Sequence, residues 1–329
     1  MIYNQNLETI IFNRHTINHA DSLIILSGYV GPTPISNLTN TGLNCTVIYG
    51  MYPSASISTS LHQVLTRIDS QNNNISIHYS TITVHSKCYI WLRNNTVVDV
   101  LLGSANFSSN GLRTPYRETL SDIDPNSYDN LMQYINHILD NAIHCNNGTP
   151  SSRNTYPTVQ ISASNVISPS RTNICHMTLL NRRGQVPTRS GLNWGNSDAH
   201  VTLGDAYIPI RVEHIANFPE LFPPKQSYPL QAHNGRLQRQ NDVIEVIWDD
   251  GTFMECLLEG NQSPAGFDED YPKQLCSSPN KNTLGIYLRN RLGVSLNHII
   301  TLEDLNNYGR TDIELSLRND GTYFANFSV

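Results

Sequence analysis

The first half of the chain alternates strand-like and helix-like segments, and this alternation restricts the possible folds more than any other feature. Residues 22–31 (SLIILSGYVG) and 45–51 (CTVIYGM) are apolar runs of strand length. Residues 57–68 carry apolar side chains at helical spacing, and residues 127–144 do so over a longer stretch. Further strand-like segments are ISIHYS, TVHSKCYIWL, TVVDVLLG and RETLSDID. Strands interleaved with helices predict an α/β domain, with a mixed sheet flanked by helices.

The second half has a different pattern. Short strand-like segments dominate it, and the turns DDG at 249–251 and NDG at 319–321 favour β-hairpins because Asp-Gly tolerates positive φ. Two short helices are expected, at about 282–292 and 301–307. This pattern predicts a mainly β domain, a small barrel with two short helices.

A segment rich in Asn, Ser, Pro and Thr separates the two halves at residues 145–160 and shows no apolar periodicity. We therefore predict an N-terminal domain over 1–150, a linker over 151–170 and a C-terminal domain over 171–329. A chain of 329 residues is long enough for each domain to bury its own core.

Bulk composition excludes several classes of protein. No apolar run approaches the roughly 18 residues that span a bilayer, and the start of the chain lacks the pattern of a secretory signal. The six cysteines never stand at C-x-x-C spacing, so we expect no disulfide framework and no zinc site. The net charge of −6 argues against indiscriminate binding to polyanions. We expect a cytoplasmic protein with reduced thiols, without cofactor or metal.

Positive charge is nevertheless concentrated locally. Residues 151–197 and 271–302 contain no Asp or Glu. The basic residues of these two segments are Arg153, Arg171, Arg182, Arg183, Arg189, Lys273, Lys281, Arg289 and Arg291. Such segments either contact a polyanion or are ordinary solvated surface, and the charge pattern alone leaves both readings open.

The segment from Val84 to Leu112 carries the residues with chemical potential. His85 and Lys87 share one face of an extended strand because side chains alternate along it. Ser104 and Asn106 share a face in the same way at the end of the next strand. Glu118 follows on a further strand-like segment. Each residue alone is more often structural, but the combination on consecutive strands is specific.

This set suits cleavage of a phosphodiester without a metal. The His85 imidazole is the candidate nucleophile and would split one difficult displacement into two easier steps. Lys87 and Asn106 would offset charge on the non-bridging oxygens. Glu118 would hold the second imidazole nitrogen and so select the tautomer.

The spacing H-x-K followed by G-S-x-N resembles the signature of the phospholipase D superfamily, through His85, Lys87, Ser104 and Asn106. Leu92 stands where many members carry an Asp, and in the nuclease branch an acid such as Glu118 takes the supporting role. The chain has one H-x-K, whereas the lipid-processing members have two. The resemblance therefore implies a homodimer, in which a second copy of His85 acts as general acid toward the leaving oxygen.

Segments of the second half, among them GLNWGNSDAHVTLGDAYIPI and LEDLNNYGRTDIELSL, resemble the C-terminal domain of NgoFVII-type restriction endonucleases. That family joins a phospholipase-D-like nuclease to a B-three-like DNA-binding pseudobarrel. The resemblance implies a type II restriction endonuclease that cuts double-stranded DNA without metal through a phosphohistidine. It also implies a cognate methyltransferase in the same system and, for some relatives, an ATPase or translocase partner.

In the pseudobarrel of this family, two arms grip the major groove, and the two acid-free segments stand where the arms are expected. Arg suits bidentate contact with guanine, Asn with adenine, and Asp can accept from cytosine. The candidate DNA-binding residues are Arg182, Arg183, Arg189, Asn193, Asn196, Asp198, Lys281 and Asn282.

Two other functions compete with this one. The chain could be a phosphodiesterase of the same superfamily acting on phospholipid or another substrate, which the single H-x-K and the basic segments disfavour. It could also be a DNA-binding module whose nuclease half is only an inactive dimerisation scaffold. The set of His85, Lys87, Asn106 and Glu118 disfavours that reading, because a scaffold has no need of all four.

Overall fold

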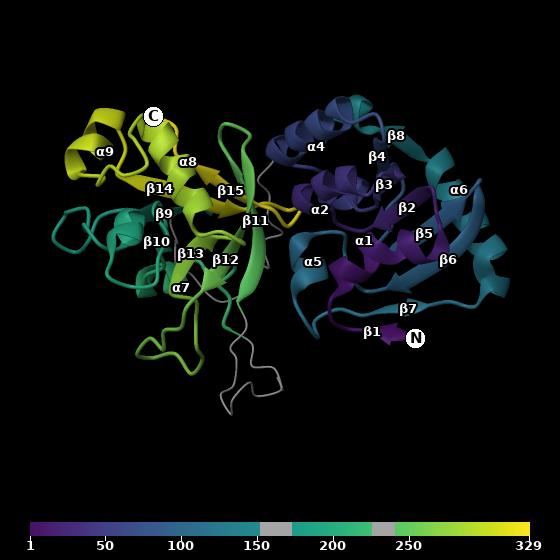
Figure 1. Ribbon diagram of the computed structural model, residues 1–329, viewed down its shortest axis with the longest axis horizontal. Helices are drawn as coiled ribbons and strands as arrows, with labels where there is room; N and C mark the ends of the chain where they lie inside the picture. The colour runs from purple at the N-terminus through teal and green to yellow at the C-terminus, as the bar shows by residue number, and fades with distance from the viewer. Residues whose placement is uncertain (152–172, 226–240) are drawn as a thin grey trace, which may run out of the picture. The chain divides into compact units, whose positions relative to one another are not determined.

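The computed structural model of the chain describes residues 1–151, 173–225 and 241–329 (Figure 1). The chain forms two compact units, the first from residues 1–156 with 318–322 and the second from residues 157–317 with 323–329. Apart from Ser151, the predicted linker lies outside the described residues. Within these ranges, no helix is both long and apolar enough to cross a bilayer.

The N-terminal unit is built on one mixed sheet of eight strands in the order β1-β7-β6-β5-β2-β3-β4-β8. Strands β2, β3 and β4 run parallel to one another, and the remaining pairings are antiparallel. The predicted α/β architecture is confirmed. The strands are β1 (Ile2–Tyr3), β2 (Ser22–Ser27), β3 (Asn44–Tyr49), β4 (Ile75–Ser80), β5 (Cys88–Arg93), β6 (Thr96–Gly103), β7 (Leu120–Asp122) and β8 (Ala142–His144).

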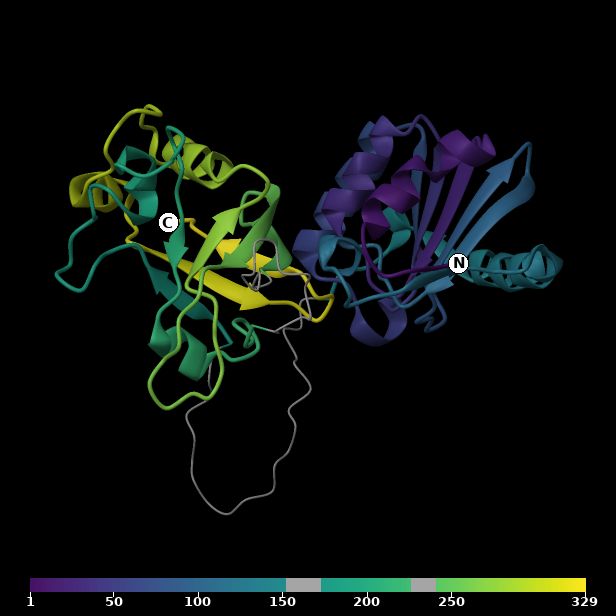
Figure 2. The same ribbon diagram turned by 60° about the horizontal axis from the view of Figure 1, so that its bottom comes forward.

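Helices cover both faces of this sheet (Figure 2). Ile135 and Ile138 of α6 pack with Leu26, Ile48 and Ile90 on one face, and α1 and α4 lie on the other. Helix α4 begins where the Ser58 hydroxyl accepts from Leu61 N–H, and its buried residues recur at helical spacing. The helices are α1 (Leu7–Asn18), α2 (Pro32–Asn37), α3 (Tyr52–Ala55), α4 (Thr59–Gln71), α5 (Ser109–Arg113) and α6 (Tyr128–Asp140).

Three predicted elements of this unit have different bounds in the structure. The helix expected over 127–144 ends at Asp140, because the chain then forms β8, which pairs with β4. The strand expected to contain His85 begins only at Cys88, and the strand expected around Glu118 begins at Leu120. The catalytic candidates therefore lie at strand ends, where a sheet can expose side chains.

The C-terminal unit is a sheet of seven strands in the order β10-β13-β12-β11-β15-β14-β9. The first and last strands of this order also contact each other, so the sheet nearly closes on itself as the pseudobarrel prediction requires. The strands are β9 (Cys175–Thr178), β10 (Ile208–Pro209), β11 (Asp242–Trp248), β12 (Phe253–Glu259), β13 (Gln274–Ser277), β14 (Asp312–Leu317) and β15 (Tyr323–Asn326). The helices are α7 (Val212–Asn217), α8 (Asn282–Leu292) and α9 (Leu302–Tyr308), with a 3-10 segment, η4 (Gly191–Asn196).

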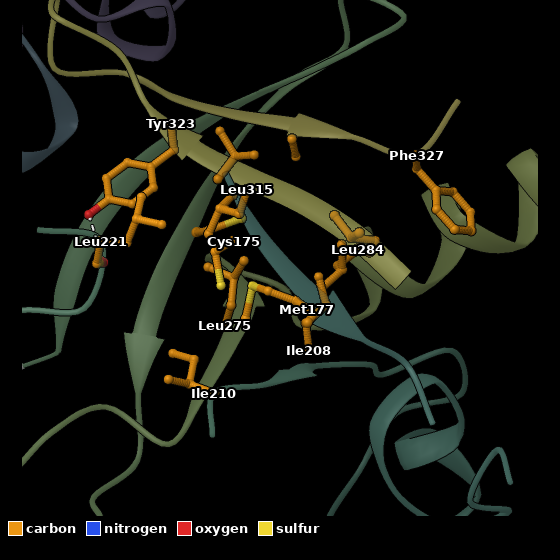
Figure 3. Close-up of a cluster of buried hydrophobic side chains, with 14 of the residues drawn as sticks. Cys175, Met177, Ile208, Ile210, Leu221, Leu275, Leu284, Leu315, Tyr323 and Phe327 are labelled. Atoms are coloured by element: carbon orange, nitrogen blue, oxygen red, sulfur yellow. Dashed lines mark hydrogen bonds between the residues drawn. The ribbon is translucent and has the colours of Figure 1, made fainter. Parts of the chain in front are cut away.

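A continuous apolar core fills this near-barrel (Figure 3). Tyr323 is part of it, and its hydroxyl donates to Leu221 O at 3.0 Å (Figure 3). Both predicted hairpin turns form, with Gly251 at φ 77° and Gly321 at φ 81°. Helix α9 opens with a capping box between Thr301 and Asp304, and α8 spans the predicted residues.

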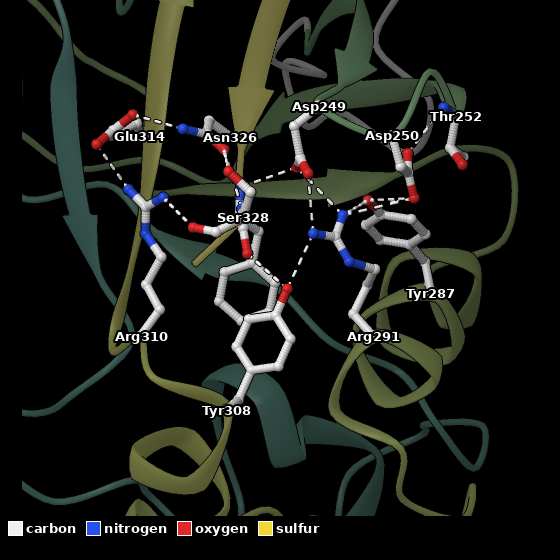
Figure 4. A network of polar contacts seen from close by, with 11 residues as sticks. Asp249, Asp250, Thr252, Tyr287, Arg291, Tyr308, Arg310, Glu314, Asn326 and Ser328 are labelled. Atoms are coloured by element: carbon white, nitrogen blue, oxygen red, sulfur yellow. Dashed lines mark hydrogen bonds and ion pairs between the residues drawn. The ribbon is translucent and has the colours of Figure 1, made fainter.

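A polar network fastens α8 and α9 to the hairpin turn between β11 and β12 (Figure 4). Arg291 donates to Asp249 at 2.9 Å and to the Tyr308 hydroxyl at 2.9 Å. Burial alone would raise the pKa of Asp249, but hydrogen bonds from Arg291 and from Phe327 N–H lower it below its usual value. Arg291 therefore stabilises the fold and faces inward.

Candidate functional site

The motif residues of the N-terminal unit meet at one edge of its sheet. The register places Cys88, the first residue of β5, beside both Leu26 of β2 and Leu102 of β6. Gly103 N–H donates to Lys87 O at 3.3 Å. The H-x-K segment that precedes β5 is thereby set opposite the G-S-x-N segment that follows β6.

His85 and Lys87 are in direct contact. The Lys87 Nζ lies 2.9 Å from His85 Nδ1 and 3.2 Å from Nε2, and it donates to His85 O at 2.6 Å. Lys87 is 6% exposed, whereas His85 is exposed to solvent. An ammonium group only donates, so the imidazole ring of His85 is the acceptor in this contact.

Burial lowers the pKa of Lys87, and the negative charge of Glu118 partly opposes this shift. Glu118 is half-buried, and no hydrogen bond joins it to His85 in the part of the chain that the structure describes. Its electrostatic effect therefore falls on Lys87, and also on Tyr89. The supporting role of Glu118 toward the imidazole stays a prediction.

Asn106 is oriented by the end of strand β2. Its Oδ1 accepts from Tyr29 N–H at 3.1 Å and lies 3.5 Å from Ser27 Oγ. With the carbonyl oxygen engaged, the group that Asn106 can offer to a ligand is the Nδ2 amide, a donor. An amide N–H can donate a hydrogen bond to a phosphate oxygen and so stabilise its negative charge.

Ser104 has a different position from Asn106. Its hydroxyl accepts from Thr119 N–H at 3.1 Å, and its own N–H donates to Thr119 O at 2.9 Å. Ser104 thus joins the end of β6 to the segment that carries Glu118.

Sequence reasoning missed the residues 27–29, which lie against the motif. A Cβ added to Gly28 would stand 3.0 Å from His85 Cδ2 and 3.4 Å from Asn106 Oδ1. The Tyr29 ring meets the His85 ring edge-on, with centroids 6.0 Å apart. The only local signal was the glycine that follows an apolar strand.

One group of potential metal ligands occurs among the described residues, formed by Asp69, His144 and Cys145. It contains none of the motif residues. Asp69 accepts from Ile77 N–H at 2.8 Å, and its other oxygen lies 3.2 Å from His144 Nε2. Both oxygens of the Asp69 carboxylate therefore have partners within the protein, and we interpret the group as structural.

In the C-terminal unit, a tight turn presents two arginines. Asn181 N–H donates to Gln185 O at 2.8 Å, and Asn181 Oδ1 accepts from Arg183 N–H at 2.9 Å. Arg182 and Arg183 at the tip are exposed, and neither forms an ion pair with another described residue. Both guanidinium groups are available to a polyanion.

The structure corrects the expectation for Asn193. Its side chain is completely buried, and its Nδ2 donates to Pro187 O at 3.0 Å and Ile300 O at 2.8 Å. Its Oδ1 accepts from Ile300 N–H at 2.9 Å and from Arg289 at 3.3 Å. An amide with these bonds cannot read a base edge, so Asn193 is a structural residue.

The other candidate DNA-binding residues differ in their exposure and in their partners. Arg189 pairs with Asp198 on the surface, where their side chains are 64% and 84% exposed. Lys281 pairs with Glu259 at 2.7 Å and lies over the Trp194 ring, 5.1 Å from its centroid. Asn196 ends η4 and Asn282 begins α8, both half-buried.

Lys273 was not among the predicted contacts. It is exposed, forms no ion pair within the described ranges, and lines a cavity of about 360 Å³ together with Arg182. Lys273 lies in the acid-free segment 271–302. The sequence alone does not distinguish it from Arg289 and Arg291 of the same segment, whose side chains face inward.

Comparison with known protein families covers both units. The NgoFVII restriction endonuclease N-terminal PLD domain matches residues 5–149, and the NgoFVII C-terminal B3-like DNA-binding domain matches residues 168–319. The chain belongs to the NgoFVII restriction endonuclease family. It is therefore an endodeoxyribonuclease with a phospholipase-D-like nuclease domain and a DNA-binding domain, and DNA is its partner. The alternative of a phospholipid-processing enzyme is set aside, because the second half matches a DNA-binding domain.

Solved structures similar to the NgoFVII-family chain include a polyphosphate kinase from Porphyromonas gingivalis, at 14% identity and a TM-score of 0.32 over 44% of this chain and 23% of that chain. NucT from Helicobacter pylori is 18% identical with a TM-score of 0.33, over 44% of this chain and 97% of that one. The phospholipase D family member Nuc from Salmonella typhimurium is 14% identical with a TM-score of 0.28, over 41% and 88%. No curated protein matches the chain. Structural similarity at these TM-scores and identities does not indicate function.

The close approach of Gly28 to His85 leads to a prediction. Gly28→Ala should slow plasmid cleavage by about 100-fold or more, because the new methyl group displaces the imidazole from its position. The rate at saturating DNA measures this effect. Affinity for cognate DNA and the thermal unfolding temperature serve as controls and should change little, so a variant that cuts at the original rate contradicts the prediction.

Proposed function

We propose that this restriction endonuclease is a type II enzyme that cleaves double-stranded DNA without a metal ion, through a covalent phosphohistidine at His85. The observation that carries the proposal is the exposed His85 imidazole, contacted by the buried Lys87 ammonium and adjacent to the oriented Asn106 amide. An exposed nucleophile next to two donors is the arrangement that phosphoryl transfer requires.

The reaction proceeds in two displacements. An imidazole nitrogen of His85 attacks the phosphorus in line, so that an N–P bond forms while the bond to the leaving oxygen breaks. Lys87 and Asn106 stabilise the charge on the non-bridging oxygens. Water then attacks the same phosphorus and releases the imidazole. Ser104 supports the loop that carries Asn106, and Glu118 supports the charged form of Lys87.

The leaving oxygen needs a proton, and one chain offers a single H-x-K. We propose that a second copy of His85, in a homodimer formed by the nuclease domains, is the general acid. A symmetric dimer of this kind has one catalytic centre and cuts the two strands in succession.

Sequence reading is proposed for the domain over 171–329, separated by the linker over 151–170 from the nuclease and dimerisation domain over 1–150. The proposed DNA contacts are Arg182, Arg183, Arg189, Asn196, Asp198, Lys281 and Asn282, now without Asn193. An ATPase or translocase subunit is the further partner proposed. A cognate methyltransferase is proposed for the same cytoplasmic restriction system, with no direct contact to this chain implied.

The nucleophile is tested with His85→Ala in excess chelator. Cleavage by the unaltered enzyme should persist in EDTA, and denaturation at alkaline pH should trap DNA bound covalently to the protein. His85→Ala should lose both cleavage and the covalent adduct while it still binds cognate DNA. His137→Ala, an exposed histidine on α6, is the matched control and should cut normally. Activity that disappears in EDTA and returns with Mg²⁺ contradicts the mechanism.

The dimer predicts the order of products. With supercoiled plasmid, a nicked intermediate should accumulate before linear DNA, because one centre serves two strands. Light scattering should report a dimer at concentrations where the enzyme is active. An active monomer, or linear product without a nicked intermediate, rules out the shared site.

The availability of the arm residues predicts unequal effects on DNA binding. Arg182→Ala or Arg183→Ala should cost about 1–3 kcal/mol of binding free energy if the residue reads a base, with the loss confined to one position of the site. A phosphate contact should instead weaken all sequences alike and reduce the salt dependence. Lys281→Ala should cost less, because Lys281 is already paired with Glu259. A panel of single-base variants at several salt concentrations measures both, and equal losses for all three variants contradict the assignment.

A further inference from the structure

Strand β2 ends in a buried serine, Ser27, that contacts both the turn after β2 and the loop after β6 that carries Asn106. Ser27 has no solvent-exposed surface. Its hydroxyl donates to Tyr29 O at 2.5 Å and accepts from Phe107 N–H at 2.9 Å. One hydroxyl therefore links the turn after β2 to the residue that directly follows Asn106.

These two bonds flank the contact that orients Asn106. The Tyr29 carbonyl is held by Ser27, and Tyr29 N–H donates to Asn106 Oδ1 at 3.1 Å. The connection continues beyond Ser27, because Val30 and Phe107 form a parallel bridge and Gly31 N–H donates to Phe107 O at 2.8 Å. The direction of the Asn106 amide thus depends on the junction of two loops, and Ser27 lies at the centre of that junction.

We propose that Ser27 is a positioning residue for Asn106, one that directs the Nδ2 amide toward the phosphate of the substrate. The inference rests on the proposed function, in which Asn106 stabilises charge on a non-bridging oxygen. Ser27 itself is buried and does not touch the substrate.

Removal of the hydroxyl has a specific consequence. In Ser27→Ala, the Phe107 N–H loses its acceptor in a buried place, and the Tyr29 carbonyl loses its donor. The Tyr29 N–H and the Asn106 Oδ1 are then free to move apart, and the Nδ2 group loses its fixed direction. Loss of one oriented donor costs on the order of 100-fold in transition-state stabilisation, so partial loss should cost about 10-fold or more.

Orthovanadate is the probe, because its five-coordinate adduct resembles the transferring phosphoryl group and its binding can be measured in inactive proteins. The full-length chain is prepared as the unaltered protein, Ser27→Ala, Asn106→Ala and the double variant. Affinities from titration calorimetry form a double-mutant cycle. Ser27→Ala should weaken vanadate binding about 10-fold or more in the unaltered background. In the Asn106→Ala background it should have almost no further effect.

Ser80→Ala is a matched control. Ser80 is also fully buried at the end of a strand, β4, and its hydroxyl donates to a carbonyl two residues ahead, Ile82 O, at 2.6 Å. Within the described residues, no hydrogen bond joins its hydroxyl to the loop that carries Asn106. Its removal should lower the unfolding temperature about as much as Ser27→Ala does and leave vanadate affinity unchanged. A purely structural role for Ser27 predicts that the two variants behave alike.

The outcomes separate the two proposals. Unchanged vanadate affinity in Ser27→Ala, or an equal loss in both backgrounds, overturns the role of Ser27 while the proposed function stands. Vanadate affinity that does not depend on Asn106 overturns the proposed role of Asn106, and the positioning role with it. Should Ser27→Ala not fold, Ser27→Cys completes the same cycle, because a thiol is only a weak donor and acceptor.

Discussion

The contact between the Lys87 ammonium and His85 is the interaction on which the proposed catalytic site depends. A buried ammonium is costly unless it is hydrogen-bonded, and Lys87 finds its partners in the ring and the carbonyl of His85. The register of β5 with β2 and β6 sets this local contact beside the segment that carries Asn106. The mixed sheet is therefore more than a scaffold, because its register decides which donors surround the imidazole.

In the DNA-binding domain, accessibility of the basic side chains depends on which of them are paired with other residues of the domain. Arg291 is held by Asp249 and Tyr308 (Figure 4). Arg289 is buried and donates to Asn193. These partners fasten α8 to the near-barrel and remove two positive charges from the surface. Arg182, Arg183 and Lys273 form no ion pair in the described part of the domain and can meet a polyanion without breaking a bond. Net charge conceals this division.

The distance along the chain between contacting residues separates the features that the sequence predicts from those that it does not. The strands, the two domain classes, α8 and the H-x-K and G-S-x-N residues all follow from local patterns of apolar and polar side chains. The 27–29 segment did not, because its partners His85 and Asn106 lie 56 or more residues away along the chain. Asn193 was misjudged for the same reason, since its bonding partner Ile300 is 107 residues distant.

The family of the chain, its two fold classes and the proposed set of catalytic side chains can be recognised from the amino-acid sequence alone. These properties depend on residue type and short spacing, which the chain carries locally. The fold is needed to see that the motif residues lie at strand ends, that Ser27 and Gly28 border them, and which arm residues are accessible. Burial and pairing are properties of neighbours in space, and strand register alone brings those neighbours together.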